Sequence, residues 1–378
     1  MLQVARGLAD AGADVEILTM NPTAHRIDAQ AAAAALAPIL FSAVAADPSR
    51  RFAPIVRALV AREPYVAARF FDRRFEKRLV ERLRGEAFDV VQIESPFLSA
   101  YLPAIRRTST ARVALRSQNV EFRIWEMLAR HASGLRAAAY RRVARSLRQW
   151  EVAATNRYDA VLPITEEDAA DFRVLGVTRP MHVVPSGMSA VPSLPSVVDP
   201  NAVYFIGSMG YRPNLESAEW ILASLWPVLR RRVPEVRLTL AGSNFPDALA
   251  RRALDAGIDV QRDVPDVMRF AAPYAVMIAP VFSGGGIRIK ALEAAAMGKA
   301  IVALGLGTGG LDLEAGEQFL EATDAESFTE AIVRCVRDPE FARGLGEAAR
   351  LRVVERYDAT VIGRRLLAFY GQLCESAS

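Results

Sequence analysis

The sequence predicts an α/β protein built from two Rossmann-like, doubly wound and mostly parallel sheets. Three observations support this prediction. Short apolar strands alternate with helical segments, the alternation stops at one Pro- and Ser-containing linker at 189–200, and it then starts again. The length of 378 residues also suits two domains, because single cores rarely grow beyond about 250–300 residues.

The first half begins with a helical pattern. Apolar residues at 1, 4, 5 and 8 have helical spacing, and Gly12 suits the end of a helix. Alternating or buried strands are expected at 14–19, 88–93, 112–116, 159–164 and 181–184, with helices at 29–37 and 135–156. Thr165 and the three acids after it predict another helix start.

The pattern restarts after the linker. Strands are expected at 202–207, 236–241, 276–281 and 300–303, and helices at 214–232, 288–297 and, after further helices, 359–374. We therefore predict domains at 1–195 and 196–358, with a terminal helical segment at 359–378. Ligands of such sheets bind beyond the carboxyl ends of the strands, so two facing domains would create one cleft.

Composition and charge exclude several classes of protein. Apolar residues make up 52%, which excludes disorder, and two cysteines cannot build a disulfide framework. Three scattered histidines offer no His-rich metal site, so we expect no metal. We see no signal peptide and no apolar run of 18 residues, and we expect a cytoplasmic protein. Of 47 basic residues only Lys77, Lys290 and Lys299 are lysines, so each deserves inspection.

The strongest motif runs from 280 to 294, where a strand leads through Gly284, Gly285 and Gly286 into a helix start with Arg288 and Lys290. Glycines let a ligand approach the backbone, free N–H groups at a helix start bind anions, and two cations would neutralise a diphosphate. Glu293, one turn further on, can accept hydrogen bonds from a ribose. The alternative is a helix cap with two solvated cations. For Lys299 we favour a structural role at the helix end, binding carbonyl oxygens.

Two further loops would face the same crevice. Gly207 and Ser208 follow a strand and could contact phosphate or sugar, with Arg212 as an extra cation. The alternative is an ordinary turn in which Asn214 caps the helix. The loop around Val264 could hold a nucleobase edge through its backbone, or simply cap the next helix.

In the first half, polar residues follow two predicted strands. Gln118, Asn119 and Glu121 come after 112–116 and would point into the cleft, unless they only begin a helix. Glu94 follows 88–93 and could contact an acceptor or sugar, although capping by Ser95 is the simpler interpretation.

The region 50–84 is strongly basic. It holds 11 Arg or Lys against four acids, a net charge of +7 within a chain of net +4. Such a surface could lie against anionic lipid headgroups, or it could be a solvated face over an apolar core side. We expect no nucleic-acid partner, because no basic motif with interleaved aromatic residues appears.

These motifs resemble those of the bacterial family 4 retaining glycosyltransferases, which have the GT-B fold. Pro280, Gly284, Gly286, Arg288, Lys290, Leu292, Glu293, Ala294 and Gly298 match the donor loop of that family in order. The stretches 207–214, 264–266 and 185–187 fit the flanking positions, and 119–121 resembles an N-domain motif of one bacterial branch. The resemblance extends over essentially the whole chain.

The resemblance implies transfer of a sugar from a nucleotide diphosphate to a glycan or lipid-linked acceptor, with retention and usually without a metal. Arg288 and Lys290 would then be catalytic, because charge builds on the leaving diphosphate. The implied donor contacts are Gly207, Ser208, Arg212, Val264, Gly284, Gly285, Gly286, Leu292 and Glu293. Glu94, Gln118, Asn119 and Glu121 would lie on the acceptor side, and the helix at 359–374 would cross back to the first domain. UDP-sugars are the default donor and GDP-sugars the competitor.

The sequence departs from the family pattern at three places. Gly285 stands where many relatives have a first glutamate of the donor loop, and Gln118 stands where a histidine is common. The family's first strand and Gly-rich loop are not seen ahead of the helix at 1–12, so we expect the strands at 14–19 and 88–93 to lack a shared neighbour. Two other functions stay open: a nucleotide-sugar epimerase of the same architecture, and a non-catalytic sugar-nucleotide-binding protein.

Overall fold

The computed structural model describes residues 1–378 except 24–25, 47–63, 131, 189–196, 284–285 and 377–378. The chain divides into two compact units. Unit 1 comprises Met1–Gly187 together with Ala359–Ser378, and unit 2 comprises Met188–Asp358. The predicted domain boundary at 195 falls outside the described residues, and unit 2 already begins at Met188.

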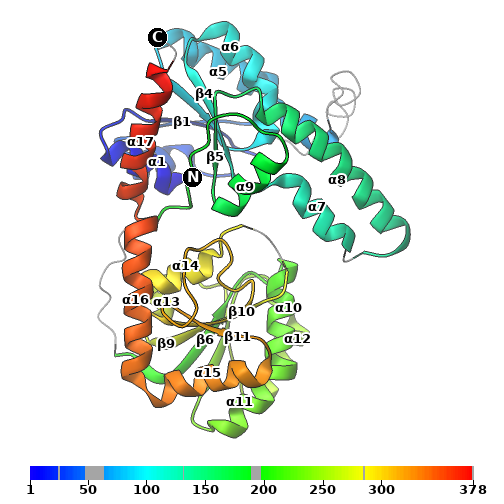
Figure 1. Ribbon diagram of the computed structural model, residues 1–378, viewed down its shortest axis with the longest axis vertical. Helices are drawn as coiled ribbons and strands as arrows, with labels where there is room; N and C mark the ends of the chain where they lie inside the picture. Colours follow the sequence, from blue (N-terminus) through cyan, green and yellow to red (C-terminus); the bar gives the residue numbers. More distant parts are fainter. Residues whose placement is uncertain (24–25, 47–63, 131, 189–196, 284–285, 377–378) are drawn as a thin grey trace. The chain divides into compact units, whose positions relative to one another are not determined.

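Unit 1 combines short parallel strands with helices (Figure 1). In chain order its elements are α1 (Leu2–Asp10), β1 (Glu16–Met20), α2 (Ala29–Leu36), β2 (Leu40–Val44), α4 (Tyr65–Ala68), α5 (Arg73–Gly85), β3 (Val90–Ile93), the 3-10 helix η2 (Pro96–Tyr101), α6 (Leu102–Thr108), β4 (Arg112–Ser117), α7 (Glu121–Arg130), α8 (Gly134–Thr155), β5 (Ala160–Pro163), α9 (Glu166–Val174) and α17 (Ala359–Glu375).

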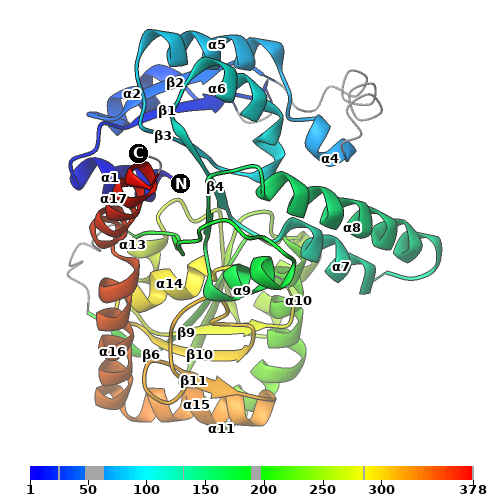
Figure 2. The same ribbon diagram turned by 45° about the horizontal axis from the view of Figure 1, so that its top comes forward.

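The strands of unit 1 form two separate parallel sheets. β1 pairs with β2, while β3, β4 and β5 form a second sheet in that order. Figure 2 shows both groups of strands within the same unit. Among the described residues β1 pairs only with β2 and β3 only with β4, so each leaves one edge without a strand partner.

The last helix packs on the first one. Figures 1 and 2 both show α17 beside α1, and Val4, Leu8, Ile362, Leu366 and Tyr370 share one buried cluster. The two helices cross at glycines: a Cβ built on Gly363 would lie 1.9 Å from the carbonyl oxygen of Gly7. Only residues without a side chain allow this approach.

Unit 2 contains one six-stranded parallel sheet. Its order is β11-β10-β9-β6-β7-β8. The elements are β6 (Asp199–Ile206), α10 (Arg212–Trp220), the π-helical turn η3 (Ile221–Leu225), α11 (Trp226–Arg232), β7 (Arg237–Gly242), α12 (Asp247–Asp255), β8 (Asp259–Arg262), α13 (Val267–Ala271), β9 (Tyr274–Val281), α14 (Ile289–Ala296), β10 (Ala300–Gly305), β11 (Leu320–Ala322), α15 (Ala325–Arg337) and α16 (Pro339–Tyr357). Buried clusters lie on both faces of the sheet, as a doubly wound fold requires.

Most predicted elements are present, and three local predictions are wrong. The segment expected as a strand at 181–184 forms only a single bridge, between Met181 and Val161, although His182 and Val184 donate backbone hydrogen bonds to Val161 and Pro163 of β5. The linker expected to reach 200 ends earlier, since β6 begins at Asp199. β2, β8 and β11 were not expected as strands. The helix predicted at 214–232 is confirmed: α10, η3 and α11 together run from Arg212 to Arg232. Within the described residues, no helix has the length and hydropathy that crossing a bilayer requires.

Candidate functional site

The candidate site lies at the carboxyl edge of the unit 2 sheet. The central strands β6 and β9 end at Ile206 and Val281, and the loops that follow them lead into α10 and α14. Figure 1 shows α10, α13 and α14 at one end of this unit. Because parallel strands present their carboxyl ends at one edge, residues far apart in sequence meet there.

Lys290 is the centre of this site. Its Nζ donates a hydrogen bond of 2.6 Å to Oδ1 of Asn214 on α10 and lies 4.2 Å from the ring centroid of Phe205 on β6. Desolvation by burial, with a further contribution from the charge of Arg288, lowers the pKa of Lys290 to about 7. The unliganded ammonium is therefore poised to lose its proton near neutral pH, and an anion beside it would restore the charge.

Arg288 is the second cation of the site. Its side chain is only 8% exposed, and Nε donates 3.0 Å to the carbonyl oxygen of Leu306. Its backbone N–H donates 3.2 Å to the carbonyl oxygen of Gly309. Burial lowers the pKa of Arg288, and the guanidinium nevertheless stays charged because its ordinary value is so high. It is thus a fixed positive charge held by backbone contacts.

The glycine-rich turn before α14 is described only at its end. Gly284 and Gly285 lie outside the described residues, whereas Gly286 adopts the left-handed conformation with φ 71°. Ser283, just before the turn, donates from Oγ 3.0 Å to Oε2 of Glu216 on α10. That contact ties the end of β9 to α10.

The loop after β6 contacts Asn214 on α10. A Cβ on Gly207 would lie 2.6 Å from Cγ of Asn214, so this glycine makes room for the asparagine. Ser208 accepts through its carbonyl oxygen a 3.0 Å hydrogen bond from Nδ2 of Asn214. Asn214 does not cap α10, which begins at Arg212 after an N-cap at Tyr211. The exposed side chain of Arg212 pairs with Glu216 at 2.7 Å.

The remaining donor candidates have mixed surroundings. Leu292 is fully buried and belongs to the core of unit 2, where it packs rather than lining a surface. Val264 is half-buried and packs against that same core. Burial raises the pKa of Glu293 on α14 above its ordinary value. Lys299 donates 2.6 Å to the carbonyl oxygen of Ala272 at the end of α13, so it binds the carboxyl end of a different helix from the expected one.

The predicted acceptor-side residues of unit 1 lie in two separate groups. Glu94 accepts hydrogen bonds from the buried Arg116 at 3.1 Å, from Gln118 at 3.3 Å and from Gln92 at 2.6 Å. Glu121 instead begins α7, and its backbone N–H donates 2.9 Å to the buried carboxylate of Glu151. The structure therefore brings Glu94 and Gln118 together and places Glu121 in a separate acidic group.

The acidic group at the start of α7 consists of Glu121, Glu151 and Asp168, and burial raises the pKa of all three carboxyl groups. Burial raises the pKa of Glu121 to about 7 and that of Glu151 to about 8. Burial also raises the pKa of Asp168 to about 6. The backbone carbonyl oxygen of Asn119 accepts a hydrogen bond of 2.7 Å from Ser117 Oγ.

Sequence reasoning missed two functional-looking residues. Asn214 was considered only as a helix cap, and its contact with Lys290 spans 76 positions, which no local spacing reveals. Arg116 is not among the predicted site residues, although an arginine that follows the apolar run 113–115 of a strand is a signal for a buried ion pair. No group of three or more His, Cys, Asp or Glu side chains is arranged to hold a metal ion in the part of the chain that the structure describes.

Family comparisons cover both units. A family model described as "Glycosyl transferase 4-like domain" matches residues 1–187, and one described as "Glycosyl transferases group 1" matches residues 200–338. An uncharacterized 44.6 kDa protein in the cps region of Klebsiella pneumoniae is 24% identical over 165 residues. That alignment covers 42% of this chain and 42% of the Klebsiella protein, so it spans less than half of either.

Solved structures of similar shape cover nearly the whole chain. Sucrose-phosphate synthase from Thermosynechococcus elongatus has a TM-score of 0.69 at 18% identity and covers 100% of this chain and 92% of its own. Anabaena HepE in complex with UDP and glucose has a TM-score of 0.65 at 13% identity, with 98% and 94% covered. At such identities the likeness establishes the fold alone, which is the GT-B fold that the motifs implied.

Proposed function

This chain belongs to the GT-B glycosyltransferases, and from that premise we propose that it transfers a sugar from a nucleotide diphosphate to a glycan or lipid-linked acceptor with retention of configuration. The observation that carries the proposal is the pair of cations at the carboxyl edge of the unit 2 sheet. Arg288 and Lys290 belong to one loop–helix junction. Arg288 Nε donates to the carbonyl oxygen of Leu306, and Lys290 Nζ donates to the amide oxygen of Asn214.

The chemistry follows from that arrangement. When the bond between the sugar and the diphosphate breaks, negative charge builds on the leaving phosphate oxygens. Preorganised cations in a desolvated site stabilise that charge strongly because they need no reorganisation. Arg288 supplies a fixed charge, whereas Lys290 becomes fully charged as the diphosphate arrives. Gly286, Ser208 and Glu293 would line the donor, with Gly284 and Gly285 in the turn beside it.

We assign the donor to unit 2 and the acceptor to unit 1. UDP-sugars are our first choice of donor, which is supported by the complex of the Anabaena relative with UDP and glucose. Glu94 and Gln118 are our candidates for acceptor contacts, since they share one hydrogen-bonded group at the ends of β3 and β4. The relative from a cps region supports a role in cell-surface polysaccharide or glycolipid synthesis.

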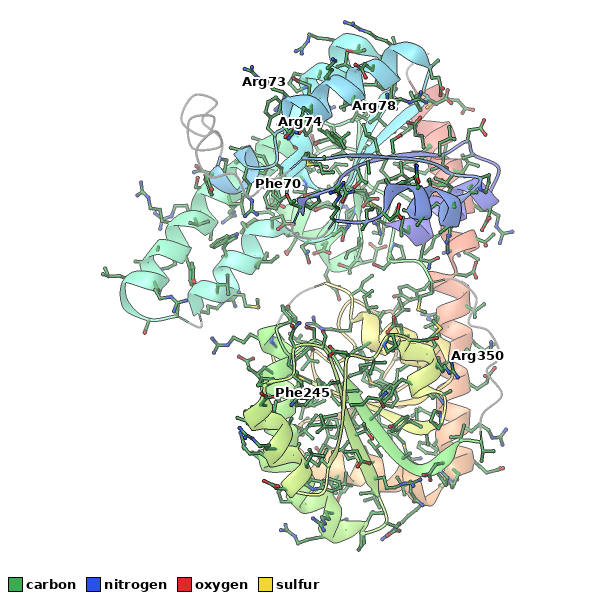
Figure 3. All side chains as sticks on the ribbon, turned by 180° about the vertical axis from the view of Figure 1, so that it is seen from behind. Phe70, Arg73, Arg74, Arg78, Phe245 and Arg350 are labelled. Carbon is green, nitrogen blue, oxygen red and sulfur yellow. The ribbon has the colours of Figure 1, made fainter. Side chains whose placement is uncertain are left out.

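We further propose that the basic surface of unit 1 contacts anionic lipid at the cytoplasmic side of the membrane. The described part of the basic region includes α5, whose Arg73, Arg74 and Arg78 side chains are labelled in Figure 3. Arg74 and Arg78 also reach Asp72 and Glu81 in exposed ion pairs, which contribute little and exchange readily with headgroups. Vesicles containing phosphatidylglycerol should sediment the protein at low salt and release it at high salt. Protein that stays in the supernatant at low salt would contradict this proposal.

One assay separates transfer from the other functions. The chain is incubated with labelled UDP- and GDP-sugars, with and without lipid-linked and glycan acceptors. Nucleotide release that depends on the acceptor supports transfer. Isomerised sugar without an acceptor would indicate an epimerase, and binding without turnover a non-catalytic protein.

Matched variants make that assay specific. Lys290→Met should reduce release by about 100-fold or more, because a charge-assisted contact to the transition state is lost. Arg350→Met is the control: Figure 3 shows this residue on α16, and its guanidinium pairs with Glu347 at the surface. Equal losses in both variants would contradict the assignment of Lys290.

A further inference from the structure

The orientation of the Asn214 amide follows from its two hydrogen-bond partners, Lys290 and Ser208. An ammonium group can only donate, so the amide oxygen of Asn214 must face Nζ, at 2.6 Å. A backbone carbonyl can only accept, so the amide nitrogen must face Ser208, at 3.0 Å. The asparagine side chain thus links the loop after β6 to the first turn of α14.

We propose that Asn214 is a positioning residue that fixes the Lys290 ammonium for the donor diphosphate without neutralising its charge. This inference rests on the proposed function. The amide supplies one hydrogen-bond acceptor and no formal charge, so the ammonium keeps its attraction for an anion. A carboxylate at the same distance would form a closed ion pair with Lys290 and compete with the phosphate.

The space for this amide comes from Gly207. A Cβ on Gly207 would lie 2.6 Å from Cγ and 2.7 Å from Nδ2 of Asn214, distances that real Cβ atoms do not show. The asparagine therefore requires a glycine at this position, and the contact of Gly207 with phosphate or sugar stays a prediction. The three residues therefore depend on one another. Gly207 leaves space for the side chain of Asn214, and Asn214 orients the ammonium of Lys290.

We assign the positioning of the Lys290 ammonium to the Asn214 amide after considering the other charged groups near it. Arg288 at the start of α14 repels the ammonium and lowers its pKa. The carboxylate of Glu216, two residues after Asn214 on α10, contacts Arg212 at 2.7 Å and Ser283 at 3.0 Å. Glu293 lies about one turn further along α14, where burial raises its pKa. Beneath the ammonium, the ring of Phe205 offers its face at 4.2 Å.

The test measures the dissociation constants of a UDP-sugar and a GDP-sugar for the full chain between pH 6.5 and 8.5. Their diphosphates are esterified at both ends, so they carry no terminal phosphate that titrates in this range. Asn214→Ala should weaken binding by about tenfold, since an oriented charge-assisted contact is lost. Asn214→Asp should weaken it by roughly 100-fold, because the new carboxylate neutralises the ammonium and repels the diphosphate. The two variants should move the pH profile in opposite directions. The aspartate raises the pKa of Lys290 and shifts the loss of affinity to higher pH, whereas the alanine shifts it to lower pH.

Controls separate positioning from folding. Asn156→Ala in unit 1 removes an amide that donates to the carbonyl oxygens of Val152 and Gly176 and accepts from the backbone N–H and hydroxyl of Thr178, so it should lower stability and leave the nucleotide affinity unchanged. Gly207→Ala should weaken binding, and Gly207→Ala combined with Asn214→Ala should be no weaker than Asn214→Ala alone. This cycle stays informative if Asn214→Asp does not fold.

The outcomes distinguish two failures. If the native chain binds neither nucleotide sugar, the proposed function is wrong and this inference falls with it. If the native chain binds a nucleotide sugar while both Asn214 variants keep its affinity and its pH profile, the inference alone is overturned.

Discussion

Raising the pH above neutrality should weaken donor binding through Lys290. Its pKa of about 7 in the free protein means that about half of the molecules carry the ammonium at pH 7 and roughly 3% at pH 8.5. If the bound diphosphate returns the pKa to about 10.4, the affinity falls in proportion to the protonated fraction. Between pH 7 and 8.5 the dissociation constant should therefore rise about 15-fold, which corresponds to about 1.6 kcal/mol.

Isothermal titration with a UDP-sugar measures this directly. The diphosphate of a nucleotide sugar is esterified at both ends and does not titrate in this range. At pH 8 binding should take up about 0.9 proton, seen as a dependence of the heat on the buffer's own ionisation enthalpy. Lys290→Arg should abolish both effects, because the guanidinium stays protonated.

The matched control is the other buried lysine of unit 2. Burial lowers the pKa of Lys299 to about 8, so it could also titrate in this window. Lys299→Arg should leave the pH dependence intact, since Lys299 donates to a carbonyl oxygen and not to the donor. A dissociation constant that changes less than twofold between pH 7 and 8.5 in the native chain would refute the reasoning.

Three further predictions concern unit 1. Gly363→Ala should destabilise it by about 3 kcal/mol in chemical denaturation, because the new Cβ would lie 1.9 Å from the oxygen of Gly7; an unchanged midpoint would contradict the packing. Glu151 has its pKa raised by burial from 4.5 to about 8, so the unfolded state loses the proton first and stability falls as pH rises between about 4.5 and 8. In Glu151→Gln the slope of the unfolding free energy against pH should be shallower, and parallel curves would count against this. Arg116→Met should lower the free energy of unfolding by about 3–5 kcal/mol, because Glu94 loses its buried partner. The denaturation midpoint should fall, and equal midpoints would contradict this prediction.

The strands that the sequence predicted are those with strong local signals. Val90–Ile93 and Tyr274–Val281 are apolar runs bounded by turn residues, so periodicity and composition suffice to find them. Asp259–Arg262 has no such signal, because it is a mostly exposed edge strand with two charged ends. Leu320–Ala322 is three residues long, which is too short for any period to show.

The residues of the candidate site also differ in how well local sequence predicts them. Arg288 and Lys290 were predictable because a strand, a glycine-rich turn and a helix start lie within 15 residues of sequence. The role of Gly207 was not, since the sequence shows a glycine in a turn but not the amide that needs its space. The partner of Lys299 was missed for a similar reason: its acceptor lies on a helix 27 residues away.

Unit 1 shows how burial changes the meaning of an acidic residue. Glu121 follows Gln118 and Asn119 closely in sequence, which suggested one common surface. The start of α7 turns its backbone N–H groups to Glu151 instead, and both carboxylates are desolvated. Only the folded chain places Glu151, 30 positions away, at that helix start.

The most direct test of the central claim is the position of the diphosphate in a crystal of the chain grown with UDP. We expect a phosphate oxygen within hydrogen-bond distance of Lys290 Nζ, with the Arg288 guanidinium beside it and the Asn214 amide still bound to Lys290. A diphosphate bound elsewhere, with Lys290 Nζ still donating only to Asn214, would contradict the account.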